Sequence, residues 1–283
     1  MKKYWPYYIA LLVFCAGIIL GSFFDFQISK SIFIDRNDFG VLMSAFGLIP
    51  AYAFLSFIGG SLFRISFKHD YKIFIKIIFY ILSLVALGCG IYFSAHEMFS
   101  YNGLNIDSVE TTVLSYVISS VINIGFSVLG FFLSMNLNNK KAWLAILLIG
   151  IASIFALVVN INGLKLIMHR PRFRALQLGI IDLRFYNWWE PCSEYTIFIN
   201  EYGVLKEEFK SFPSGHAAAS LLVSYFLVFI TYCIPKLKKY KNAFFLIGFI
   251  YCLIMSFSRM LVGAHSLTDV SWGGLLSLIV FWV

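Results

Sequence analysis

The sequence predicts an all-α integral membrane protein with about eight membrane-spanning helices. Hydrophobic residues make up 60% of the 283 residues, and the mean hydropathy is +0.83. Only 13% of the residues are charged, whereas soluble domains usually have roughly 25%. The apolar residues also gather in long runs, and a helix needs roughly 20 of them to cross a hydrocarbon core.

The apolar runs predict the helices in chain order. They occupy residues 5–24, 40–63, 73–95, 112–136, 142–163, 215–234, 242–262 and 267–283. Lys2 and Lys3 precede the first run, as in a signal peptide, but no small-residue cleavage site follows it, so we expect it to stay as a helix. The last run is still apolar at Val283, and we expect the natural chain to continue beyond it.

The net charge of +8 is explained by membrane orientation and not by a nucleic-acid partner. With the N-terminus in the cytoplasm, the basic residues concentrate in the inner loops: Arg64, Lys68, Lys72, Lys76, Lys140, Lys141, Lys236, Lys238, Lys239 and Lys241. The outer loops hold Lys30 and Arg36 and then no basic residue between 97 and 111, and Asp70 is the one acidic residue on the inner side. This asymmetry follows the positive-inside rule.

Three polar clusters stand at the ends of apolar runs, all on the outer side of this topology. They are Lys165 with Arg172, then Pro213-Ser214-Gly215-His216, then Ser258-Arg259 with His265 and Asp269. The outer segments that carry them are residues 164–214 and 258–266. Together they supply fixed cations for a phosphate and two histidines for a nucleophile and an acid.

The third cluster is the most specific. Asp269 follows His265 by four residues, about one turn of a helix, so its carboxylate could hold the imidazole in one tautomer and stabilise its cationic form. This arrangement suits a histidine nucleophile. Arg259 lies across an expected helix break at Gly263 and could offer its planar fork of donors to phosphate oxygens.

The second cluster opens a helix. Ser214 is a natural N-cap, and Gly215 allows a close approach of the backbone. Unpaired amides and the dipole at a helix start favour an anion, so we expect a phosphate cradle here. His216 would stand beside the phosphate and act as the general acid.

In the first cluster, Lys165 and Arg172 are seven residues apart, nearly two helical turns, and would share a face from which Arg170 points away. Pro171 is expected to end the helix. We therefore expect Arg172, and not Arg170, to bind phosphate. Taken alone, Lys165 or Arg170 would more often be an interfacial anchor, and it is the occurrence of all three clusters on one side that favours a site.

Residues 170–212 also contain many aromatic side chains: Phe185, Tyr186, Trp188, Trp189, Tyr195 and Tyr202. Such a density is typical of a segment that rests at the lipid headgroups. The alternative is a lid that shapes substrate entry.

At these residues the chain resembles the type 2 phosphatidic acid phosphatase superfamily. The signature of that family is a Lys and an Arg-Pro separated by six residues, a Pro-Ser-Gly-His, and a Ser-Arg, His, Asp set. The second and third parts match completely, and the first matches at Lys165 and Arg172, with Phe173 where the family usually has Pro.

The resemblance implies a six-helix catalytic core at residues 73–283, with its active-site loop at 164–214, and two additional helices within residues 1–72. It implies a phosphohistidine on His265, oriented by Asp269, with His216 first as acid and then as activator of water. The phosphate-binding residues would be Lys165, Arg172, Ser214, Gly215 and Arg259. It implies no metal and no cofactor.

We therefore expect a membrane phosphatase that acts on a lipid phosphate or diphosphate at the extracytoplasmic face of the cell membrane. Phosphatidate, phosphatidylglycerophosphate and polyprenyl diphosphate all fit. A phosphotransferase using the same intermediate is an alternative. A transporter or non-catalytic lipid binder is another, although intact His216, His265 and Asp269 argue against it. The abundance of Phe, Ile, Lys and Asn is typical of an AT-rich bacterial genome.

Overall fold

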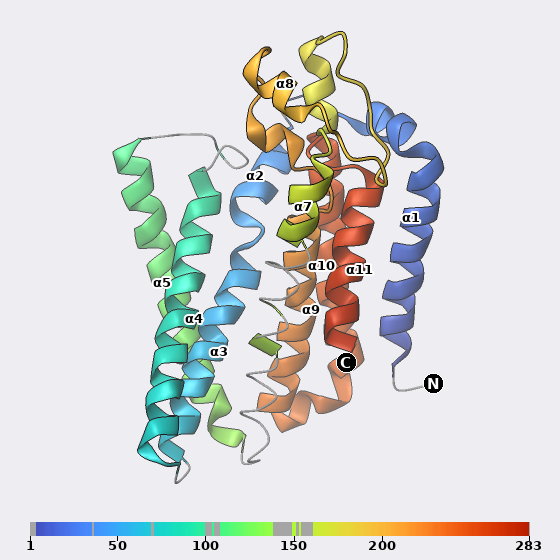
Figure 1. Ribbon diagram of the computed structural model, residues 1–283. Helices are drawn as coiled ribbons and strands as arrows, with labels where there is room; N and C mark the ends of the chain where they lie inside the picture. The colour runs from blue at the N-terminus through green and yellow to red at the C-terminus, as the bar shows by residue number, and fades with distance from the viewer. Residues whose placement is uncertain are drawn as a thin grey trace. The chain divides into compact units, whose positions relative to one another are not determined.

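The protein is an all-helical, multi-pass membrane protein. The computed structural model describes residues 4–35, 37–68, 71–99, 104, 108–137, 149–150, 153 and 161–282, and these residues include no β-strand (Figure 1). Six helices in this part of the chain are long and apolar enough to cross a membrane: Trp5–Ile32, Asp38–Phe67, Ile73–Phe99, Val109–Leu133, Gly215–Cys233 and Pro235–Leu261.

These spans confirm six of the predicted apolar runs and sharpen their bounds. Helix α1 (Trp5–Ile32) is longer than the run that predicts it, and the second run divides into α2 (Asp38–Phe46) and α3 (Ile49–Lys68). Pro50 stands in the first turn of α3, where proline is tolerated and favours a new helix start. The next helices are α4 (Ile73–Phe99), α5 (Val109–Leu133), α9 (Gly215–Cys233) and α10 (Lys241–Leu261).

Two predicted spans have a different outcome. The last run forms α11 (Leu267–Trp282), but its apolar stretch, Leu267–Val280, is shorter than the six candidate spans. The run at 142–163 falls largely outside the described residues.

Contacts divide the chain into two compact units. The first unit comprises Met1–Gly40, Ser153–Leu221 and Ile250–Val283, and the second comprises Val41–Ala152 and Leu222–Phe249. Every site residue predicted from the sequence falls in the first unit.

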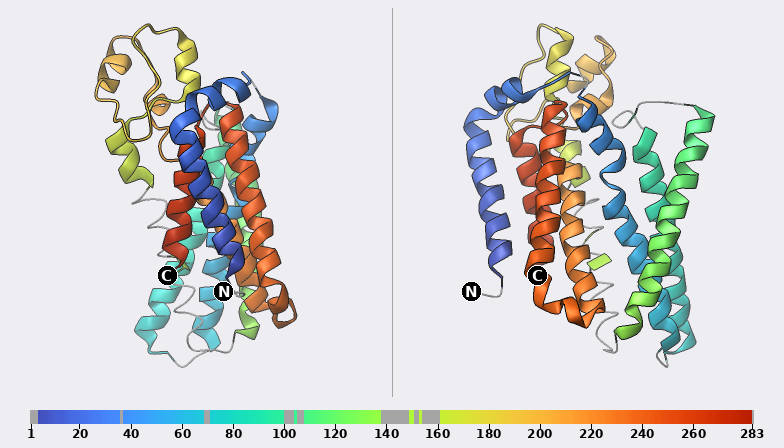
Figure 2. Two further views of the ribbon diagram at one scale, coloured as in Figure 1. Left: turned by 90° about the vertical axis from the view of Figure 1, so that its right-hand side faces the viewer. Right: turned by 180° about the vertical axis from the view of Figure 1, so that it is seen from behind.

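In the second unit, α3, α4 and α5 run side by side (Figure 2). Small residues permit this close packing, since a Cβ added to Gly60 would lie 1.8 Å from the Ser127 carbonyl oxygen. A buried amide provides polar contacts across the helices: Asn123 accepts a hydrogen bond from Ser56 Oγ at 2.7 Å and donates one to Ser94 Oγ at 3.2 Å. Such bonds stabilise helix association where no water is available.

In the first unit, α1 lies alongside α11 (Figure 1). The contact uses a pair of glycines four residues apart on α1, as in other close helix pairs in membranes. A Cβ on Gly17 would lie 2.2 Å from Ser271 Oγ, and one on Gly21 would lie 2.6 Å from Thr268 Cγ2. This close approach brings polar groups of α1 to the start of α11.

The loop 164–214 is folded and has a small hydrophobic core of its own. It contains α7 (Gly163–Met168), two 3₁₀ turns, η3 (Phe173–Leu178) and η4 (Lys206–Phe209), and α8 (Tyr195–Asn200). The buried core residues are Ala175, Leu183, Tyr186, Cys192, Phe198, Val204 and Phe209. Trp189 and Tyr202, by contrast, are each 50% exposed, as expected for side chains at the headgroup level.

The α1–α11 contact predicts opposite effects for two Gly→Ala substitutions. Alanine normally stabilises a helix interior by roughly 0.5–1 kcal/mol relative to glycine. Gly88→Ala in α4 should therefore keep or raise the thermal unfolding midpoint in detergent, since no described atom lies within 4 Å of its added Cβ. Gly21→Ala should lower the midpoint because its Cβ would press on Thr268 and Asp25. Equal midpoints for the two variants would contradict the close α1–α11 packing.

Candidate active site

The three motif clusters meet through main-chain hydrogen bonds. Three such bonds join them: Arg174 N to Gly263 O at 3.1 Å, Ser211 N to Arg170 O at 3.0 Å, and Ser214 N to Asp269 O at 2.9 Å. Each bond links a segment of one cluster to a segment of another. Main-chain hydrogen bonds alone therefore hold the three clusters next to one another.

The turn after α10 positions His265. Gly263 has φ +62°, a left-handed conformation that glycine adopts without strain and that commonly ends a helix. The amides of Ala264 and His265 both donate to the Arg259 carbonyl, at 3.1 and 3.3 Å. The expected helix break is confirmed, and the turn holds His265 with only 1% of its surface exposed.

The backbone contact of His265 determines its tautomer. Nδ1 lies 2.7 Å from the Ser211 carbonyl oxygen, which can only accept a hydrogen bond, so Nδ1 carries the proton. Nε2 of the neutral ring then has the lone pair. Asp269 Oδ2 is more distant from Nδ1, at 4.0 Å. The predicted one-turn helical relation is wrong because α11 begins at Leu267, after His265.

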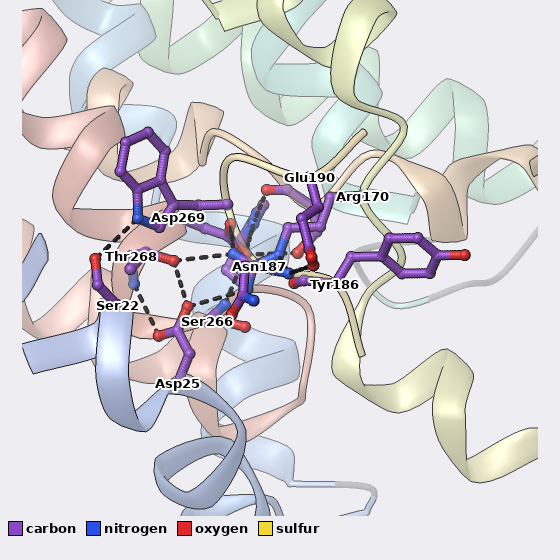
Figure 3. Close-up of polar contacts among 12 residues, drawn as sticks. Ser22, Asp25, Arg170, Tyr186, Asn187, Glu190, Ser266, Thr268 and Asp269 are labelled. Carbon is purple, nitrogen blue, oxygen red and sulfur yellow. Dashed lines mark hydrogen bonds and ion pairs between the residues drawn. The ribbon is translucent and has the colours of Figure 1, made fainter. Parts of the chain in front are cut away.

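Asp269 is completely buried. Its carboxylate accepts several hydrogen bonds, and Figure 3 labels its partners Arg170 and Ser266. Oδ1 accepts a hydrogen bond from Arg170 Nη1 at 2.6 Å. Oδ2 accepts from Ser211 Oγ at 2.6 Å and from the Ser266 amide at 2.8 Å. Asp269 therefore reaches His265 mainly through Ser211, whose carbonyl accepts a hydrogen bond from the imidazole Nδ1.

The start of α9 has the geometry expected of an anion cradle. Ser214 Oγ accepts a hydrogen bond from the Ala217 amide at 3.3 Å, which confirms it as the N-cap. A Cβ added to Gly215 would lie 3.8 Å from Lys165 Nζ, so the ammonium is close to the first turn. The His216 ring follows, with its centroid 6.2 Å from that of His265.

Positive charge surrounds His265. Burial lowers the pKa of His265 well below 6.5, and the charges of Arg172, Lys165 and Arg259 lower it further, with a smaller effect from His216. Arg172 and Arg259 are 3% and 1% exposed, and Arg259 Nη1 donates to the Gly40 carbonyl at 3.3 Å. The structure thus brings the three predicted phosphate-binding cations to one imidazole.

The route by which Lys165 and Arg172 meet differs from the prediction. Helix α7 ends at Met168, and His169 adopts a left-handed φ of 42° with its ring stacked on Tyr195 at 3.6 Å between centroids. The two cations therefore do not share a helix face. Arg172 instead lies on an extended stretch with φ −73° and ψ 149°.

Four residues of the site were not found from the sequence: Asp25, Arg170, Ser211 and Thr268. Arg170 and Arg172 flank Pro171 in a non-helical stretch, and no local sequence pattern separates their roles. Asp25 had a signal, because it directly follows the apolar run 5–24 and stands between Phe24 and Phe26, and an acid in such surroundings usually has a functional partner.

The two arginines should have different roles that paired substitutions can separate. Arg170→Met should lower the thermal midpoint strongly, since removing one partner of a buried ion pair costs roughly 3–5 kcal/mol. Arg172→Met should weaken the binding of vanadate, a phosphate analogue, about tenfold or more, since a charge-assisted hydrogen bond contributes about 1.5–3 kcal/mol. Thermal unfolding and vanadate titration of both variants would test this, and the reverse pattern would contradict the assignment.

Comparisons with known proteins agree with this geometry. The family model of the PAP2 superfamily matches residues 141–283, just over half of the chain. Phosphatidylglycerophosphatase B of Bacillus subtilis (strain 168) is 35% identical over 77 residues, which are 26% of this chain and 36% of that protein. The chain thus matches about a third of the length of this relative. No solved structure matches the chain. The chain belongs to the PAP2 superfamily, as its three motif clusters predicted.

Proposed function

We propose that this PAP2-superfamily protein is a metal-independent membrane phosphatase that hydrolyses a lipid phosphate or diphosphate through a phosphohistidine. The observation that carries the proposal is the state of His265. Its Nδ1 proton is held by the Ser211 carbonyl, which leaves the lone pair on Nε2. The neighbouring ring of His216 and the charges of Lys165, Arg172 and Arg259 provide an acid and a phosphate-binding surface.

In the first step, the phosphate oxygens bind the three cations and the amides at the start of α9. Nε2 of His265 attacks phosphorus, and the bond from phosphorus to the leaving oxygen breaks. His216 donates a proton to that oxygen, because its imidazolium form is favoured once the bound phosphate offsets the charges of the nearby cations. The products are a phosphohistidine and, from a monoester, the lipid alcohol.

In the second step, neutral His216 accepts a proton from a water molecule as the water oxygen attacks phosphorus. The nitrogen–phosphorus bond breaks, inorganic phosphate leaves, and His265 regains its lone pair. His216 is again the imidazolium, which completes the cycle. The cations hold the phosphoryl group in both steps.

Three observations support a lipid as the substrate. The site residues lie at the ends of apolar helices, where a lipid headgroup would meet them. The exposed aromatic side chains of the loop fit the same depth. The relative from Bacillus subtilis is named for phosphatidylglycerophosphate, so this lipid comes first among the candidates.

We also propose the arrangement of the chain in the membrane. The basic inner loops support a cytoplasmic N-terminus and an extracytoplasmic site in a bacterial cell membrane. Residues 73–283 would form the six-helix core, preceded by two additional helices within residues 1–72. This assignment requires residues 142–163 and 267–283 to span the membrane as well.

Phosphate release by purified protein tests the function. Wild type should release phosphate from at least one of phosphatidylglycerophosphate, phosphatidate and polyprenyl diphosphate, and it should do so with chelator present. His265→Ala should lose the activity, because His265 supplies the nucleophile in this mechanism. The release of inorganic phosphate is measured in detergent micelles.

His169→Ala is the matched control, since this histidine belongs to the same loop but stacks on Tyr195. It should retain most of the activity. If wild type released phosphate from none of these lipids while a control phosphatase did, the proposal would fail. Transfer of phosphate to an added alcohol, in place of release, would identify a phosphotransferase.

The pKa of the His265 imidazole can be measured directly. Its imidazole resonance, assigned by its loss in His265→Gln, should titrate with a midpoint well below pH 6.5 in the free enzyme. Burial and the nearby cations disfavour the imidazolium, so the ring should stay neutral as the pH falls through 6.5 and lose its nucleophilic lone pair only below that. A midpoint at or above 6.5 would contradict the charge distribution described above.

A further inference from the structure

Asp25 of α1 lies outside the part of the chain that the PAP2 family match covers, yet its side chain reaches the site. The residue is buried, with 4% of its surface exposed. Its carboxylate accepts hydrogen bonds from Arg170 Nη2 and from the Thr268 amide, each at 3.0 Å, and from the Thr268 hydroxyl. Figure 3 shows Asp25 pointing from α1 toward Thr268 and Arg170.

The partners of Asp25 lead to the nucleophile in three contacts. Arg170 also donates to Asp269 Oδ1 at 2.6 Å. Asp269 in turn accepts from Ser211 Oγ at 2.6 Å, and the Ser211 carbonyl accepts the Nδ1 proton of His265 at 2.7 Å. The orientation of His265 therefore depends on a chain of buried hydrogen bonds that begins on α1.

Asp25 contacts this series of hydrogen bonds at two points, the Arg170 guanidinium and the first turn of α11. Its bond to Nη2 fixes the plane of the Arg170 guanidinium, whose Nε donates to the Tyr186 carbonyl at 2.8 Å and whose Nη1 also contacts Thr268 Oγ1 at 2.9 Å. Its bond to the Thr268 amide satisfies a main-chain donor in the first turn of α11, as a capping side chain does. Asp269 lies in that same turn.

Charge explains why an acid is needed at this position. The Arg170 guanidinium is 1% exposed and lies between the Asp25 and Asp269 carboxylates. A buried ion must be paired and hydrogen-bonded on all sides. Without the Asp25 carboxylate, Arg170 Nη2 would lose its charged partner, and the guanidinium that holds Asp269 would be less firmly fixed.

We propose that Asp25 is a positioning residue of the phosphatase site, by which α1 holds Arg170 and the start of α11 so that Asp269 and Ser211 keep His265 in its reactive orientation. This inference rests on the proposed phosphatase function. The helix α1 thereby completes the site.

The test compares Asp25→Asn, Thr268→Val and Ser29→Ala in the purified full chain. Asp25→Asn removes the charge at constant size, and Thr268→Val removes the hydroxyl that touches both Asp25 and Arg170. Ser29→Ala is the matched control, because Ser29 is one turn further along the buried face of α1 and its hydroxyl has no hydrogen-bond partner among the described residues. Both kcat and KM are measured for the lipid that wild type hydrolyses best.

Asp25→Asn should lower kcat about tenfold to a hundredfold, since a small misplacement of a reacting group has an effect of that size. Its KM should stay within about twofold, because the phosphate-binding cations are not disturbed. Thr268→Val should lower kcat several-fold, and Ser29→Ala should match wild type. In an Arg170→Gln background, adding Asp25→Asn should have a smaller effect than it has alone, since the two side chains act as one unit.

The outcomes separate the inference from the function on which it rests. Two results would overturn the positioning role while leaving the proposed phosphatase function intact. One is a wild-type kcat in Asp25→Asn. The other is a double variant, Asp25→Asn with Arg170→Gln, whose loss of kcat equals the product of the losses in the two single variants. If Asp25→Asn failed to fold, a wild-type kcat in Thr268→Val would overturn it. If wild type itself released no phosphate, both the proposed function and this inference would fail.

Discussion

The buried ion pair between Arg170 and Asp269 is the interaction on which the site depends. The two side chains are 1% and 0% exposed, and Nη1 lies 2.6 Å from Oδ1. Removing both charges from water is costly, so the pair is favourable only when the remaining donors and acceptors find partners. Those partners come from α1, from the loop 164–214 and from the start of α11. One ion pair therefore fixes the geometry of three segments.

His265 lies close to charges of both signs. The Nδ1 side faces the Ser211 carbonyl and, behind it, the Asp269 carboxylate. The cations Lys165, Arg172 and Arg259 surround the same ring and disfavour its protonation. A phosphate would bring negative charge to the cations, while the carboxylate would stabilise the positive charge that develops on the ring during attack. Under the proposed mechanism, the arrangement would therefore favour the transition state over the resting ring.

The sequence predicted the parts of this account that depend on residue type and local spacing. The family, the N-cap at Ser214, the helix break at Gly263 and the cluster of both histidines with three cations all follow from short motifs. The partner of His265 could not be predicted, because a main-chain carbonyl such as that of Ser211 has no signal in residue type. The bond from Asp25 to Thr268 joins residues 243 positions apart, and only the packing of α1 on α11 brings them together.

Trapping of the phosphorylated enzyme tests the central claim most directly. Wild type is mixed briefly with a lipid carrying radiolabelled phosphate, quenched in alkaline detergent and digested. The label should be stable in base and labile in acid, as expected for a phosphohistidine, and should map to the peptide that contains His265. Label on any other residue, or phosphate release by wild type with no labelled enzyme under rapid quenching, would contradict the account.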